Sequence, residues 1–376
     1  MKKVKVEKEE RVYFFDTMRA ILILFIVFIH VLQNFNSNNS WLIHNPDTIQ
    51  IAPFLIDSLM LFTLQSFFIM SGYLAIISIK KTNINNFFNS RIKRILIPIF
   101  FTALTFNSLQ TYVLYQAEWI KDFTLYAYLT KGEWISHLWF LIDLVIFFLL
   151  TYLFIIFFSR GLKKITYLFN RFFENTGVYF VLVLFSFIIL LLLILFSLLS
   201  PYIYNHTIDI RSIFFYFPFF VLGAFLATNK DFFKAFIQLS IIKTLLITIL
   251  LTYISIYFSE GQHGIEKMAY YFFNATSNLF ASALCFSFFY KFFNKKSKLF
   301  HFLAEASFSV YLFHHLVVVS IGIMLIKFHI GGYLALFILF GMVIVISLII
   351  HHFLISKIQI LGFLYNGKSI KREKNV

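Results

Sequence analysis

Long apolar stretches alternate with short polar loops along the chain, and this pattern recurs ten times. Each stretch is about 20 residues long, the length that an α-helix needs to cross a bilayer. The predicted membrane helices lie near residues 13–33, 54–79, 95–115, 137–158, 178–199, 213–228, 241–258, 272–290, 307–326 and 332–355. The sixth is short and contains Pro218 and Gly223, and its loss would invert the orientation of everything after it. The pattern predicts an all-α polytopic membrane protein with about ten transmembrane helices.

The positive charges alternate between successive loops. With ten helices, 26 of the 32 Lys and Arg residues fall on the side of the two termini, five fall on the other side, and Arg19 lies within the first helix. Because cytoplasmic loops are rich in Lys and Arg, both termini are expected in the cytoplasm. We expect a single domain over 1–376, with a basic tail at 1–11, a helical bundle over 13–355 and a cytoplasmic tail at 356–376. No small-residue cleavage pattern follows the first helix, so it is expected to stay uncleaved.

Composition supports a membrane protein and narrows its partners. Hydrophobic residues make up 60% of the chain and charged residues 13%, whereas soluble proteins have about 25% charged residues. The net charge of +15 follows from membrane orientation, so we expect membrane lipids and no nucleic acid as partners. The single cysteine, Cys285, excludes an intrachain disulfide or a cysteine metal cluster. His351 and His352 lack further ligands of definable geometry, so no metal site is predicted.

The first helix carries the polar residues that are hardest to explain as scaffold. Ionisable side chains inside a membrane helix are expensive and by default mark a function. The eleven-residue step from Arg19 to His30 is three turns, which places both on one face, roughly 16 Å apart. Asp16 can pair with Arg19 at i and i+3, an arrangement that also suits an arginine reaching the membrane surface. His30 is either an interfacial side chain or a general base suited to neutral pH.

Two further segments offer groups for an anionic ligand on the cytoplasmic side. Ser71 and Gly72 in the second helix either allow close helix packing or contact a ligand. Arg91, Lys93 and Arg94 lie in the loop before the third helix, where guanidinium groups can grip a phosphate in bidentate fashion. Anchoring to anionic lipid is the alternative for this basic group.

Polar and aromatic residues also gather on two further helices and in the outer loops. His137, Trp139 and Asp143 open the fourth helix from the outer side. Tyr311 and His315 share a face of the ninth helix, and because that helix starts in the cytoplasm we expect them on the inner side of the site. The outer loops add aromatic side chains that either pack on sugars or anchor at the membrane interface: Trp41, His44, Trp119 and Trp134.

Taken in order, five motifs resemble the membrane-bound acyltransferase-3 family over nearly the whole chain. They are Arg19 and His30 separated by ten residues, Phe14-x-Asp16, Phe67-Phe68-x-x-Ser71-Gly72-Tyr73-Leu74, Arg91-x-x-Arg94 before Pro98, and Tyr311-Leu312-Phe313-His314. The stretch His137-Leu138-Trp139-Phe140-Leu141 and the doubled His314-His315 are similar to the branch that adds succinyl groups to periplasmic glucans. The chain departs from many relatives in having Leu316 and Val317 where a proline follows the last motif, and in lacking an extracellular hydrolase-like domain.

The resemblance implies transfer of a succinyl or acetyl group from cytoplasmic acyl-coenzyme A to a sugar hydroxyl at the outer face of the bacterial inner membrane. The acceptor would be a periplasmic or cell-surface glycan, an osmoregulated periplasmic glucan or a lipid-linked glycan, with glucan-synthesis proteins as partners and no bound cofactor. The resemblance assigns three roles to residues of this chain. Catalysis is assigned to His30, Arg19 and Asp16, and binding of the acyl donor to Arg91, Lys93, Arg94, Ser71 and Gly72. Binding of the acceptor, or support of the catalytic residues, is assigned to His137, Trp139, Asp143, Tyr311, His314 and His315.

Two other classes of protein would also fit ten helices with buried polar residues. A transporter or flippase of a glycan or lipid-linked glycan could line its pathway with the same arginine and histidines. No pair of Gly/Pro-broken helices recurs in corresponding halves of the chain, which weakens that interpretation. A purely structural partner of a polymerase would explain the topology but not the polar residues of the first helix.

Overall fold

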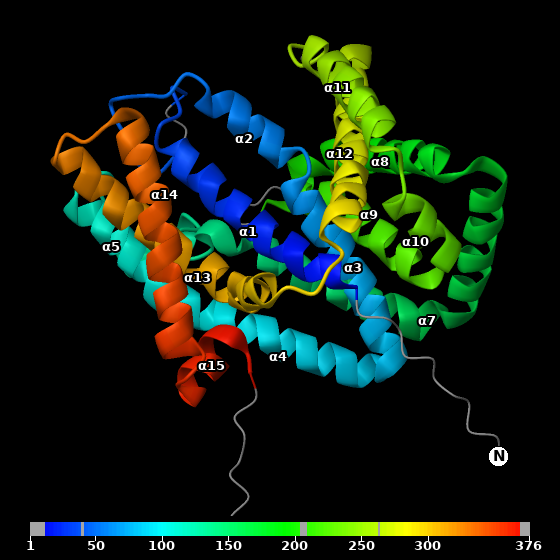
Figure 1. Cartoon of the computed structure of the whole chain (residues 1–376), viewed down its shortest axis with the longest axis horizontal. Coiled ribbons are helices and arrows are strands. Elements are labelled where there is room, and N and C mark those ends of the chain that lie inside the picture. Colours follow the sequence, from blue (N-terminus) through cyan, green and yellow to red (C-terminus); the bar gives the residue numbers. More distant parts are fainter. Residues whose placement is uncertain (1–11, 39–40, 204–208, 262–263, 369–376) are drawn as a thin grey trace, which may run out of the picture.

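The computed structural model describes residues 12–38, 41–203, 209–261 and 264–368, and every regular element within these ranges is a helix (Figure 1). The first half contains α1 (Tyr13–Gln33), α2 (Ala52–Met60), α3 (Thr63–Lys81), α4 (Ile84–Thr102), η1 (Ala103–Asn107), α5 (Ser108–Gln116), α6 (Leu125–Thr130), η2 (Ser136–Leu138), α7 (Trp139–Thr176) and α8 (Val178–Ile203). The second half contains α9 (Ile210–Thr228), α10 (Lys230–Ile237), α11 (Ile241–Tyr257), α12 (Gly264–Phe293), α13 (Lys298–Lys327), α14 (Gly332–Ile349), η3 (Ile350–Ile355) and α15 (Gln359–Asn366). The all-α prediction is confirmed.

The number of membrane-spanning helices agrees with the hydropathy pattern. In the described part of the chain nine helices are long and apolar enough to cross a membrane, or ten if α10 and α11 count as one span bent by 78°. The short sixth span, with its internal Pro218, is present as α9. The side of the membrane on which each terminus lies remains a prediction.

Several predicted helix boundaries are wrong, because helices begin in polar turns that hydropathy assigns to loops. The third span starts at Ile84, where the side chain of Asn83 accepts a hydrogen bond from the backbone of Asn86 at 2.8 Å, so Arg91 and Arg94 lie on a helix and not in a loop. Such caps satisfy the free N–H groups of a first helical turn. The second span is broken into α2 and α3, and the predicted C-terminal tail contains the helix α15.

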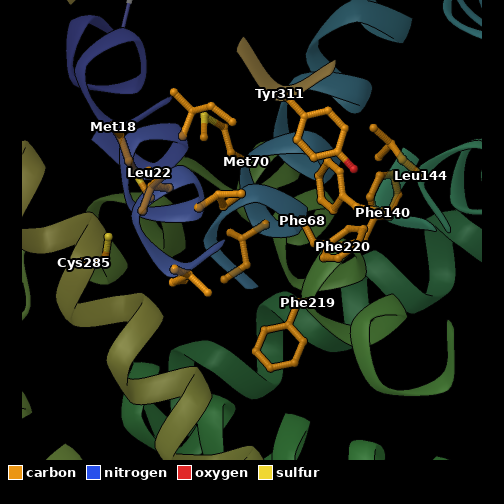
Figure 2. Packing of buried hydrophobic residues seen from close by; sticks show 14 of the residues in the cluster. Met18, Leu22, Phe68, Met70, Phe140, Leu144, Phe219, Phe220, Cys285 and Tyr311 are labelled. Atoms are coloured by element: carbon orange, nitrogen blue, oxygen red, sulfur yellow. The ribbon is translucent and has the colours of Figure 1, made fainter. Parts of the chain in front are cut away.

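The first helix runs through the middle of the bundle (Figure 1). It contacts α2, α3, α12, α13 and α14, and side chains along its length are completely buried, among them Phe14, Met18, Leu22 and Val27. Figure 2 shows Met18 and Leu22 on one side of the core, opposite the rings of Phe68, Phe140 and Phe220. The two polar ends of α1 are therefore held by packing on several sides.

The closest helix contact, between α3 and α9, depends on two glycines. A Cβ atom on Gly72 would lie 1.9 Å from the backbone oxygen of Phe220, and one on Gly223 would lie 1.9 Å from the backbone oxygen of Ile69. Small residues let membrane helices approach this closely and gain packing energy. Helix packing therefore accounts for Gly72.

We expect Gly72→Ala and Gly223→Ala to destabilise the protein, because a methyl group at either position must push two helix backbones apart. Overpacking of this kind typically costs about 1–3 kcal/mol. Gly341→Ala in α14 is the matched control, since no atom of a neighbouring helix lies within 4 Å of its added Cβ, and it should hold or raise stability. Thermal unfolding of the purified variants in detergent measures the difference. Equal unfolding midpoints for Gly72→Ala and Gly341→Ala would contradict the close contact.

Candidate functional site

Four histidines from three parts of the chain meet at the far end of α1. His30 belongs to α1, His137 to η2, and His314 and His315 to α13. The ring centroid of His30 lies 5.2 Å from that of His314 and 4.7 Å from that of His315. His137 stacks on His315 with centroids 4.6 Å apart. We call these four residues the histidine cluster; His137, His314 and His315 are buried in it, and His30 is half-buried.

The depth predicted for His315 is wrong. The sequence predicts it on the inner side of the site, but its ring lies 4.7 Å from that of His30 and 5.2 Å from that of Trp41, in the loop that follows α1. The reason is that α13 begins at Lys298, where the Ser297 side chain accepts from the backbone of Phe300 at 3.3 Å, and not near residue 307. The added turns carry His315 to the level of His30.

Hydrogen bonds orient three of the imidazole rings in the same way. Nδ1 of His30 lies 3.3 Å from Oε1 of Gln33, Nδ1 of His314 lies 2.7 Å from the backbone oxygen of Tyr311, and Nδ1 of His315 lies 3.0 Å from Oε1 of Gln110. An amide oxygen can only accept, so each neutral ring carries its proton on Nδ1 and leaves Nε2 as an acceptor. The cluster therefore presents imidazole nitrogens that can take a proton or accept a hydrogen bond.

One of these acceptors is left open inside the protein. Nε2 of His314 is buried, and no hydrogen-bond partner for it is found among the described residues. Buried polar atoms nearly always have a partner, so an exception needs an explanation. An open acceptor beside His30 fits a site that binds a hydrogen-bond donor or passes a proton.

The remaining outer residues divide between this cluster and a separate contact. The hydroxyl of Tyr311 donates to the backbone oxygen of His137, and their rings lie 5.4 Å apart, so Tyr311 supports the cluster. Asp143 instead accepts a 2.7 Å hydrogen bond from the Ser212 hydroxyl on α9. The ring of Trp139 lies 5.9 Å from that of Tyr216, also on α9. These contacts place Asp143 and Trp139 at the junction of α7 and α9.

The other end of α1 meets a group of arginines. Arg19, half-buried, interacts electrostatically with Asp16 and with Arg94, and Arg91 interacts with Arg94 and Arg19. We call Arg19, Arg91 and Arg94 the arginine cluster. Asp16 offsets one of these three positive charges, and an anionic ligand would offset the remaining repulsion between them, so the arrangement favours binding of a phosphate-bearing ligand.

The other donor candidates lie around this cluster with different exposure. A carboxylate oxygen of Asp16 lies 3.5 Å from Nδ1 of His301 on α13, at the opposite end of α1 from the histidine cluster. Lys93 is exposed and Ser71 is half-buried next to the glycine contact of α3 and α9. The three arginines are thus the part of the predicted donor site that the structure brings together.

The C-terminal helix packs directly against the arginine cluster. Helix α15 contacts α4, and the Tyr365 hydroxyl lies 3.1 Å from that of Thr105. Gly367, with φ +57°, ends α15, and its N–H donates to the backbone oxygen of Phe363. This left-handed conformation suits glycine at a helix end. A Cβ atom there would lie 2.5 Å from the Cα of Arg94, so α15 helps to position that arginine.

Sequence reasoning missed Gln33, Gln110 and Gly367. The spacing of three residues between His30 and Gln33 is a local signal that could have been read, because i and i+3 side chains are neighbours on a helix. Gln110 and Gly367 carried no such signal, since their partners lie far away in the chain. Among the described residues, no group of three or more His, Cys, Asp or Glu side chains is arranged to hold a metal ion.

We expect nitrogen NMR of ¹⁵N-histidine-labelled protein to show His30, His314 and His315 as neutral rings with the proton on Nδ1. Gln33→Leu removes the acceptor for the His30 proton, so that ring should populate the other tautomer while the signals of His314 and His315 stay in place. Gln238→Leu, an exposed change between α10 and α11, serves as the control. An unchanged His30 signal in Gln33→Leu would show that Gln33 does not orient the ring.

Comparison with known proteins gives one family and several distant relatives. Residues 12–352 match a family model described as an acyltransferase domain. Glucans biosynthesis protein C of Escherichia coli O157:H7 (strain EC4115 / EHEC) and that of Escherichia coli K12 are each 26% identical to the chain over 388 residues, covering 97% of both proteins. No solved structure matches the chain.

Proposed function

The chain belongs to the acyltransferase-3 family, which makes it a membrane acyltransferase, and from this premise we propose that it moves an acyl group from acyl-coenzyme A to a sugar hydroxyl of a glycan. The observation that carries this proposal is the placement of two clusters at opposite ends of α1. Arginines lie at the end that is predicted to be cytoplasmic, and histidines lie at the other. An extended thioester arm held at the first end would reach along α1 toward the second.

The arginine cluster suits the phosphate groups of coenzyme A. Guanidinium groups bind phosphate in bidentate fashion and keep their charge when partly buried. The family resemblance assigns Arg19 to catalysis, where it could stabilise either the donor or negative charge at the reacting carbonyl. Its neighbours Arg91 and Arg94, together with its distance of roughly 16 Å along the helix from His30, support the donor role.

At the histidine cluster, His30 is the general base of the proposed reaction. Its Nε2 takes the proton of the sugar hydroxyl while that oxygen attacks the thioester carbonyl. The C–S bond then breaks, the new ester stays on the sugar, and the proton on Nε2 returns to the leaving thiolate. Throughout, the Nδ1–H bond to Gln33 at 3.3 Å keeps Nε2 aimed at the substrate and stabilises the charged ring.

The proposed identities of the acyl group and the acceptor are based on similarity to the relatives. Their printed name places them in glucan biosynthesis, which favours a glucan as acceptor, and similarity to the branch that adds succinyl groups favours succinyl over acetyl. We propose the bacterial inner membrane as its location, in keeping with relatives from Escherichia coli. Family membership favours acyl transfer over the alternative of glycan transport.

Mass spectrometry of envelope glycans tests the proposal in cells with the intact gene, a deletion, or His30→Ala. We expect one acyl mass to disappear in both altered strains, because loss of a general base lowers kcat about 10²–10⁴-fold. His352→Ala, an exposed histidine outside the histidine cluster, should leave acylation intact. Unchanged acylation in the deletion strain, with glycan retained on the cytoplasmic side, would indicate transport instead.

Arg91→Ala and Arg94→Ala should each raise the KM for acyl-coenzyme A about tenfold, the effect of losing about 1.4 kcal/mol of binding. Gly367→Val should act in the same direction, because its side chain displaces the backbone of Arg94. Arg171→Ala, an exposed change on α7, is the control. Steady-state kinetics with purified protein separates KM from kcat. A loss of protein abundance with an unchanged KM would count against the donor site.

A further inference from the structure

A hollow opens at the same end of the molecule as the histidine cluster. Its volume is about 360 Å³, and it lies between the end of α5 and the end of α13. The lining combines one indole ring, two charged side chains and aliphatic residues: Ala117, Glu118, Trp119, Ile323, Ile326 and Lys327. Binding sites for small molecules share this composition of apolar walls with a few polar groups.

Packed aromatic side chains connect this hollow to His30. Trp41 lies 5.9 Å from His30 and 5.2 Å from His315, measured between ring centroids. Trp41 and Trp119 both pack against one small buried cluster, formed by Ile43, Leu114, Val319 and Ile323. His44, from the same loop as Trp41, meets the Trp119 ring edge to face at 4.9 Å. Packed side chains thus link the hollow to the histidine cluster.

The backbone presents Trp119 in a fixed orientation. The backbone N–H of Trp119 donates to the backbone oxygen of Leu114 at 2.9 Å, and the backbone N–H of Glu118 donates to that of Tyr115 at 3.0 Å. Glu118 has φ +63°, an uncommon conformation for a residue with a side chain. Such conformations cost energy and gather at binding and catalytic sites. The turn holds the half-buried indole in the hollow and leaves the Glu118 side chain exposed.

The chemistry of the hollow fits a sugar residue. An indole face packs on the C–H face of a pyranose ring, while a carboxylate and an ammonium group pair with its hydroxyls. Glu118 and Lys327 are both exposed at the rim, where they can meet such hydroxyls. A lipid chain would leave both charges without a partner, and the hollow lies at helix ends, away from the apolar middle of the bundle.

We propose that the hollow at Trp119 binds a second sugar residue of the acceptor, while the residue to be acylated lies beside Trp41 and His30. This inference rests on the proposed function and extends it, because it makes the preferred acceptor an oligosaccharide and not a single sugar. The segment 41–51 contacts both positions, through Trp41 at His30 and through His44 at Trp119. It is held in place by a 3.0 Å hydrogen bond from the Asn45 amide to the Ile330 oxygen and by Gly331, whose Cβ would meet Asp47 at 1.8 Å.

Calorimetric titration of the inactive His30→Ala protein with glucose and with a linear glucose tetrasaccharide tests this site without turnover. The tetrasaccharide should bind more tightly than glucose. Adding Trp119→Ala should weaken tetrasaccharide binding about tenfold and leave glucose binding unchanged, whereas Trp119→Phe should retain most of the affinity. Tyr126→Ala, an exposed aromatic on α6 that is 78% accessible, is the control for a general effect of losing an aromatic side chain.

Equal binding of both sugars, or an equal loss for both in Trp119→Ala, would overturn the second subsite and identify Trp119 as an interfacial anchor. Transfer assays with the wild-type protein keep this result separate from the proposed function. Acyl transfer that shows no Trp119-dependent preference for the tetrasaccharide overturns the subsite alone. Absence of transfer to either sugar overturns the proposed function, and the titration still decides whether the hollow binds glycan.

Discussion

Polar side chains buried on α1 set the main constraint on this bundle. In an apolar surrounding each polar group needs a partner, because water is not there to replace it. Arg19 at one end of the helix is half-buried beside Asp16, and His30 at the other end bonds Gln33. The helices that pack around α1 supply the remaining partners, so the two ends of this one helix determine where the polar residues of its neighbours gather.

The histidine cluster shows how that constraint produces chemistry. Side-chain and backbone oxygens accept hydrogen bonds from Nδ1 of His30, His314 and His315. Nε2 of each of these rings is therefore a hydrogen-bond acceptor. A purely structural core would avoid an open acceptor such as Nε2 of His314, because an unpaired buried atom opposes folding. Its presence is better explained by a site that handles protons or hydroxyl groups.

The length of α1 separates the two functions that acyl transfer needs, which are binding of the donor phosphates and deprotonation of the acceptor hydroxyl. Phosphate groups are held best by fixed positive charge, which α1, α4 and the packing of α15 on α4 provide. Deprotonation of a hydroxyl is done best by a neutral imidazole with one oriented nitrogen, which the far end of α1 provides. A positive charge close to that imidazole would oppose its taking up a proton, and the length of the helix keeps the arginines away from it.

Local properties of the sequence were enough for the architecture and for the axis of the site. Hydropathy predicted ten spans, and the described residues contain nine, or ten if α10 and α11 count as one. The eleven-residue spacing placed Arg19 and His30 on one helix face, because helix geometry depends only on neighbouring residues. Tertiary structure alone decided that His30, His137 and Gln110 meet at His315 and that Gly367 abuts Arg94. These contacts join residues far apart in the chain, and they depend on where helices begin and how they pack, which the apolar pattern does not encode.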